Sequence, residues 1–146
     1  MANLSAVIAD PNKRRAVVDD GVSVIEAEVA DKGGLSGLAI KAAFGMVKKV
    51  RPGFVGQALN ALLDEFAQAV DPIWAECTAK GGDPAATFAA QAPRVSEALL
   101  KITDKRAAGA SGPVKATYEK LRPEAVKHTV AAMPRVAGLL KKHASA

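Results

Sequence analysis

The sequence predicts an all-α protein, a compact bundle of about five to six helices with proline-kinked helices, forming a single helical domain over residues 1–146. Hydrophobic residues make up 49% of the chain and aromatic residues 4%, and apolar positions recur at helical spacing. Three Asp-Pro steps, at residues 10–11, 71–72 and 83–84, predict helix starts, because Asp caps a helix and proline tolerates its first position. Glycine pairs at residues 33–34 and 81–82 predict helix ends.

The chain is expected to open with a short turn over residues 4–9 that folds back on the bundle. A helix over residues 11–32 follows, with a buried stripe that includes Val18, Val22 and Ile25. Gly21 lies inside this helix, where glycine costs about 1 kcal/mol relative to alanine. We therefore expect another helix to cross closely at this glycine.

The next expected helix, residues 36–50, is apolar around nearly its whole circumference. Gly37 and Gly45 would permit close backbone approach, and an Arg-Pro-Gly sequence ends the helix. Such a helix must be surrounded by other helices, a partner chain or lipid. We expect it at the centre of the packed bundle. Its only charges are three lysines, Lys41, Lys48 and Lys49.

Four further helical segments are expected in the remainder of the chain. They cover residues 54–70, 72–80, 84–102 with a kink at an interior proline, and 113–143 as one kinked helix or two. The glycine-rich connector 107–112 is expected to be a mobile loop. A four-residue likeness around two prolines 41 residues apart leaves a short α-solenoid of helix pairs as the alternative fold.

Charge is unevenly distributed along the chain. The net charge is +5, and successive blocks 1–40, 41–51, 52–100 and 101–146 carry −2, +4, −4 and +7. One explanation is that the acidic middle packs beside the basic end within the molecule. The other is an acidic partner: nucleic acid, anionic lipid or an acidic protein surface.

Little in the sequence suggests chemistry, and we predict no enzyme and no catalytic, cofactor or metal site. His128 lies four residues after Glu124, a spacing that predicts a surface hydrogen bond rather than a catalytic pair. Cys77 is the only cysteine, so no internal disulfide can form and a reducing cytoplasmic location is expected. No export signal or membrane-spanning segment is expected. Trp74 is expected to fill the core with its N–H bonded at the rim, although a small apolar ligand near it is left open.

The run from Ala30 to Lys41, ADKGGLSGLAIK, followed by VRPGF at residues 50–54, resembles an uncharacterised bacterial family of small all-helical proteins. The opening Ala9-Asp10-Pro11 with its basic residues resembles the same family, and the similarity covers most of the chain. The resemblance implies a compact helical domain and carries no activity with it.

Three functions without catalysis are therefore considered. The first is association with another protein or with itself as a homo-oligomer, because the apolar helix needs burial. The second is binding to an anionic membrane surface, and the third, less favoured, is non-specific nucleic-acid binding by the basic C-terminal third. The candidate partner- or anion-binding residues are Lys41, Lys48, Lys49, Arg51, Lys141 and Lys142.

Overall fold

The computed structural model describes residues 3–109 and 112–144, apart from the side chains of residues 36, 113, 114, 117 and 121. This part of the chain forms seven helices and no strand, which confirms the all-α prediction. The helices are α1 (Leu4–Val7), α2 (Pro11–Asp31), α3 (Gly34–Val50), α4 (Phe54–Ala79), α5 (Pro84–Ala89), α6 (Ala92–Ala108) and α7 (Gly112–Ala144).

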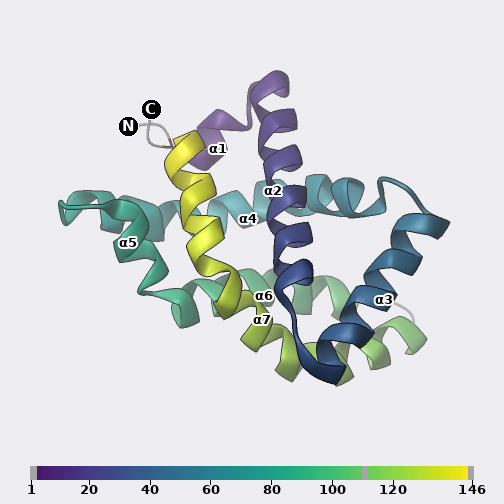
Figure 1. Ribbon diagram of the computed structural model, residues 1–146. Coiled ribbons are helices and arrows are strands. Elements are labelled where there is room, and N and C mark those ends of the chain that lie inside the picture. Colours follow the sequence, from purple (N-terminus) through teal and green to yellow (C-terminus); the bar gives the residue numbers. More distant parts are fainter. Residues whose placement is uncertain (1–2, 110–111, 145–146) are drawn as a thin grey trace.

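The helices form two crossing layers (Figure 1). In the view shown, α2 and the C-terminal half of α7 lie side by side in front of α4 and α6, which run across behind them. Gly21 marks the crossing of α2 and α4, as expected, because a Cβ there would lie 2.5 Å from the Leu59 Cδ2. The first and last helices also pack together. An α-solenoid, in which each repeat contacts only its neighbours, is therefore not the fold.

The expected helices 54–70 and 72–80 are one continuous helix, α4, so the Asp-Pro step between them does not start a helix. The Asp71 carboxylate is engaged elsewhere. It accepts hydrogen bonds from the backbone N–H groups of Leu4 (2.8 Å) and Ser5 (3.2 Å) and from the Ser5 hydroxyl (2.5 Å). It thus holds the N-terminus of α1 against α4, and the opening turn folds back as predicted. The other two Asp-Pro steps do cap their own helices.

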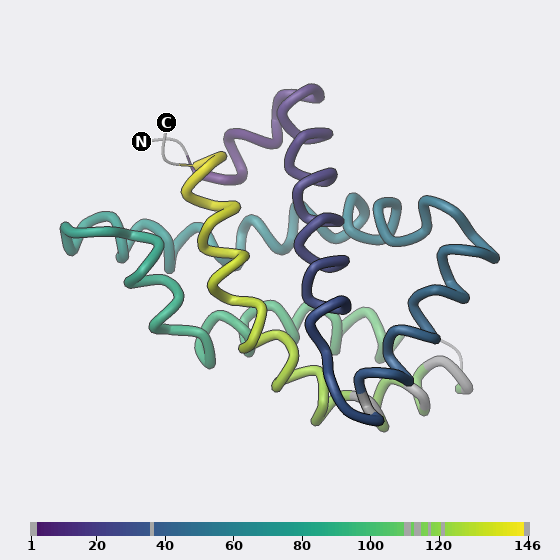
Figure 2. Tube along the Cα trace, in the orientation of Figure 1, coloured from purple at the N-terminus to yellow at the C-terminus, as the bar shows by residue number. Residues whose placement is uncertain are grey.

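Interior prolines have different outcomes in the two halves of the C-terminal region. The expected kinked helix 84–102 is instead two helices, α5 and α6, because Pro93 occupies the first turn of α6. Pro123 and Pro134 lie inside α7, which is one helix. Figure 2 shows α7 bending in its middle, in line with the expected proline kink. Of the predicted mobile connector 107–112, Ala107 and Ala108 belong to α6 and Gly112 starts α7, while residues 110–111 are outside the described residues.

One hydrophobic core joins α1, α2, α4, α5, α6 and α7. Trp74 is 2% exposed and meets Phe88 edge-on, with ring centroids 5.7 Å apart. The prediction that Trp74 fills the core is confirmed, but the prediction for its indole N–H is wrong: no acceptor among the described residues bonds it. The other fully buried side chains of large volume include Met133, Leu140, Val17, Val95 and Cys77.

The expectation that the apolar helix lies at the centre of the bundle is wrong. The helix forms as predicted, as α3, but it lies at the periphery, and none of its described side chains belongs to the core. In Figure 1 it connects the lower end of α2 to the far end of α4, away from the crossing layers. Among the described residues its main contacts are with α2 and, more sparsely, with α4.

Candidate interaction surface on helix α3

Glycines set both ends of α3. Gly33 precedes the helix in an extended conformation and offers no side-chain cap, and Gly34 has φ +70°, which disfavours any other residue. At the other end Gly53 has φ +81° and starts α4 after Arg51 and Pro52 have ended α3. The helix is therefore joined to the bundle by two sharp corners.

One side of α3 rests on the bundle. Phe44 is half-buried on this side, and Gly37 approaches the corner after α2 so closely that a Cβ would lie 2.6 Å from the Lys32 carbonyl carbon. Lys48 pairs with Glu26 of α2 at 3.4 Å and lies over the Phe44 ring. A shallow groove of about 110 Å³ runs between α2, α3 and the start of α4. Close approach at Gly37 is confirmed, whereas Gly45 faces open space.

The other side of α3 is uncovered and mostly apolar, with Lys49 among its residues. We define the outward face of α3 as its four large aliphatic side chains there, which at about 100° per residue fall within an arc of about 120°. All are more than three-fifths exposed: Leu35 86%, Leu38 64%, Met46 67% and Val50 70%. With Val47 and Phe54, these are the large hydrophobic residues exposed in the described part of the chain. Contiguous exposed apolar surface on the order of 500 Å² commonly marks a contact site.

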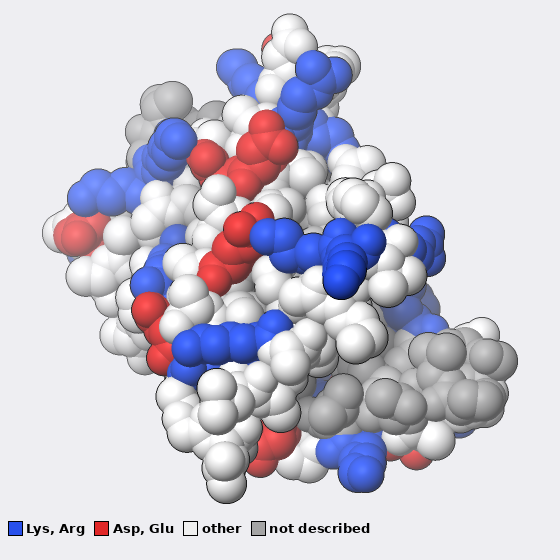
Figure 3. All heavy atoms as spheres, turned by 45° about the vertical axis from the view of Figure 1, so that its right-hand side comes forward, with Lys and Arg blue, Asp and Glu red and all other residues white. Residues whose placement is uncertain are grey.

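The charged residues that α3 carries on and beside the outward face are all basic. Lys41 and Lys49 are exposed and have no ion pair with a described residue. Arg51 stacks on the Phe54 ring at 4.9 Å, next to the end of the helix. In Figure 3, which brings the α3 side forward, blue basic groups border white uncharged surface.

The structure does not bring the remaining candidate residues to this surface. Lys141 and Lys142 lie at the end of α7, which packs against the side of α2 opposite to α3 (Figure 1). Lys141 pairs with Asp83 at 3.6 Å, and Lys142 pairs with Asp20 at 2.9 Å. The hydrogen bond from Lys142 is the main cause that lowers the pKa of Asp20, and His143, at 2.6 Å, is the next. These two lysines have intramolecular partners, whereas Lys41 and Lys49 have none among the described residues.

Ion pairing within the molecule accounts for much of the charge asymmetry. Arg135 of α7 pairs with Glu28 and Asp31 of α2, so the basic end of the chain lies on its acidic beginning. Arg106 likewise pairs with Glu65 of the acidic middle at 2.7 Å. Self-neutralisation therefore accounts for part of the basic C-terminal third, but Lys41 and Lys49 of α3 have no such partner among the described residues.

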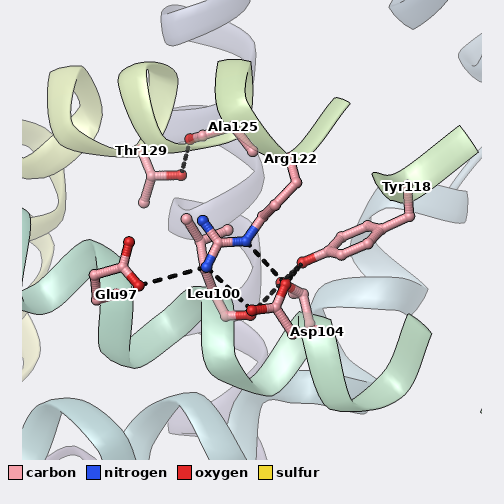
Figure 4. A network of polar contacts seen from close by, with 8 residues as sticks. Glu97, Leu100, Asp104, Tyr118, Arg122, Ala125 and Thr129 are labelled. Atoms are coloured by element: carbon pink, nitrogen blue, oxygen red, sulfur yellow. Dashed lines mark hydrogen bonds and ion pairs between the residues drawn. The ribbon is translucent and has the colours of Figure 1, made fainter. Parts of the chain in front are cut away.

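A second polar cluster, which sequence reasoning missed, joins α6 and α7 (Figure 4). Arg122 donates to both oxygens of Asp104 (2.9 and 3.0 Å), and the Tyr118 hydroxyl donates to the same carboxylate at 2.6 Å. The hydrogen bond from Arg122 is the main cause that lowers the pKa of Asp104, and the one from Tyr118 is the second. Burial is the main cause that raises the pKa of Tyr118. The cluster borders a cavity of about 280 Å³. Its polar groups bond one another, so its geometry fits a clamp between helices.

Tyr118 and Arg122 are four residues apart, a spacing that places them on one face of α7. That spacing was the only signal for this cluster in the sequence, because Asp104 comes from another helix. The predicted pair of Glu124 with His128 is not among the hydrogen bonds of the described residues, where Glu124 contacts Lys127 at 3.6 Å.

The described residues contain no group of three or more His, Cys, Asp or Glu side chains arranged to hold a metal ion. None of their helices combines the length and the apolar character that crossing a bilayer requires.

Comparison with known proteins places the chain in a family but assigns it no activity. No curated protein and no solved structure matches it. A family model described as a family of unknown function (DUF6918) matches residues 4–144, nearly the whole length. This protein therefore belongs to that family of unknown function.

Proposed function

We propose that this protein is a non-enzymatic helical module that acts by association, and that it does so through the outward face of α3. The observation that carries the proposal is the exposure of Leu35, Leu38, Met46 and Val50 on one helix. Apart from Val47 and Phe54, the other large apolar side chains in the described part of the chain are buried or partly buried. A monomer rarely leaves such a patch in water without use, because covering it is favourable. The contacting surface is another protein, a second copy of the chain or a membrane.

The nucleic-acid alternative has less support. The basic residues of the C-terminal third that would contact phosphates include Arg122, Arg135, Lys141 and Lys142, which already pair with carboxylates. Binding would require these intramolecular pairs to be given up. We further propose a bacterial, cytoplasmic setting, which rests on the family resemblance and on the reducing environment that the single Cys77 favours.

The proposal is tested with the double variant Leu38→Gln/Met46→Gln, which makes the outward face polar. A control, Ala86→Gln/Ala131→Gln, adds the same groups at exposed positions of α5 and α7. We expect the wild type and the control to bind an apolar fluorescent dye and the α3 variant to bind much less. Light scattering over a range of protein and salt concentrations should show any self-association of the wild type, and the α3 variant should lose it.

The outcome that refutes the proposal is equally specific. A wild type that stays monomeric throughout and binds no more dye than the α3 variant would show that the outward face of α3 attracts nothing.

A further inference from the structure

We infer that the occupant of the outward face of α3 is the surface of an anionic lipid bilayer. The inference rests on the proposed function, because it requires α3 to be the contact surface, and it adds the chemistry of the partner.

The segment that contains α3 is basic and lacks acidic residues. Between Asp31 and Asp64 the chain has no acidic residue, while it carries five basic ones. Two of these have carboxylate partners, Lys32 with Glu28 and Lys48 with Glu26. The remaining three, Lys41, Lys49 and Arg51, form no ion pair with a described residue. A partner of complementary charge is therefore negative.

A second copy of the chain is a poorer occupant of this face than a bilayer. Two outward faces pressed together would bury on the order of 1,000 Å², which is the lower limit for a stable interface. They would also bring two acid-free basic helices together, and like charges repel. A bilayer surface has no such limit of area, and phosphatidylserine or a similar lipid supplies the negative charge.

Basic side chains of α3 lie beside and within its outward face. At about 100° per residue Lys41 borders the face on the side of Leu38, and Lys49 lies between Leu38 and Leu35. Lysine can bury its hydrocarbon chain along an apolar surface while its ammonium group reaches the headgroups. Phe54, 39% exposed, and Arg51 lie beyond the end of the helix. Apolar side chains with basic groups beside them are typical of helices that lie in a membrane interface.

The experiment is flotation of the full-length protein with two kinds of vesicle, phosphatidylcholine alone and an equimolar mixture of phosphatidylcholine and phosphatidylserine. We expect binding to the mixed vesicles only, and weaker binding at high salt. Lys41→Glu/Lys49→Glu should lower the apparent affinity at least about tenfold, because each basic residue near the surface contributes to the attraction. Lys101→Glu/Lys105→Glu, on exposed positions of α6, makes the same change in net charge and should lower the apparent affinity much less.

A fluorescence measurement reports insertion directly. The only native tryptophan, Trp74, is 2% exposed in the core, so its emission should not respond to vesicles. Met46→Trp places a second indole on the outward face of α3. Its emission should shift to shorter wavelength with mixed vesicles and remain unchanged with phosphatidylcholine alone.

Each other outcome has a definite meaning. No flotation with mixed vesicles, no shift at Met46→Trp, or equal losses in the two charge variants would overturn the lipid inference. If the protein instead forms a dimer that salt strengthens and Leu38→Gln/Met46→Gln abolishes, the partner is a second copy and the proposed function stands. If neither membrane binding nor α3-dependent association is found, both proposals are wrong.

Discussion

Replacing two methionines by alanine, one at a time, tests whether α3 stands outside the core. Met133 is fully buried, whereas Met46 on α3 is 67% exposed, so the same chemical change is made in opposite environments. Deleting a buried methionine side chain costs about 2–5 kcal/mol, the sum of lost burial and the cavity left behind. The same deletion at an exposed helix position changes stability by about 0.5 kcal/mol or less.

The assay is urea unfolding followed by far-ultraviolet circular dichroism. A domain of this length has a total stability of about 5–15 kcal/mol, so Met133→Ala should remove a large part of it. In a thermal scan, at roughly 2–4 °C per kcal/mol, the expected decrease in Tm is about 4–20 °C. Met46→Ala should leave both curves nearly unchanged. Similar losses for the two variants would refute the placement of α3 at the periphery.

Three further predictions concern individual contacts. Gly37→Ala should destabilise the protein by about 1–3 kcal/mol, because its Cβ would lie 2.6 Å from the Lys32 backbone, whereas Gly45→Ala, with nothing within 4 Å, should stabilise it by up to about 1 kcal/mol in urea unfolding. Asp71→Ala should cost about 0.5–2 kcal/mol and increase hydrogen exchange in α1, since the carboxylate caps that helix. Asp104→Asn should be less stable than the wild type at neutral pH. Because the pKa of Asp104 is lowered from 3.8 in the fold, that difference should persist above this value and disappear only as the pH falls below it. A difference in stability between the Asp104 variant and wild type that grows on acidification would contradict this assignment.

The helices could be predicted because their signals are local. Apolar spacing, Asp-Pro starts and glycine ends place α2 and α3 within a few residues of their observed bounds. Gly21 even indicated a crossing before its partner, Leu59 of α4, was known. Each of these inferences needs only the properties of neighbouring residues.

The location of α3 could not be predicted in the same way. Hydrophobicity favours removing a side chain from water, but it does not specify which surface covers that side chain. Leu38 and Met46 carry the same pattern whether a helix of the same chain, a partner or lipid covers them. The acid-free segment around them favours a negatively charged partner only when the face is also uncovered, and exposure is a tertiary property.

The Asp-Pro steps show a similar limit. Asp71-Pro72 has the same residues as the steps that start α2 and α5, yet α4 continues through it. The difference is a tertiary one, since the Asp71 carboxylate bonds to Ser5, 66 residues away in the sequence. In the same way, the clamp of Arg122 on Asp104 joins residues of two helices that no local pattern connects.

In most helices the same residues must both pack in the core and present an outer surface. Because α3 is absent from the core, its outer residues are free of the first requirement. Residues of α7 such as Met133 are constrained by neighbours on every side, so few exchanges are tolerated there. Positions such as Leu38 and Met46 have no such neighbours on their outer side, so only a bound partner would constrain them. The segment between the two glycine corners is thus an exchangeable cassette: its outer residues can diverge, or be redesigned for a new adhesive property, while the remaining helices preserve the architecture.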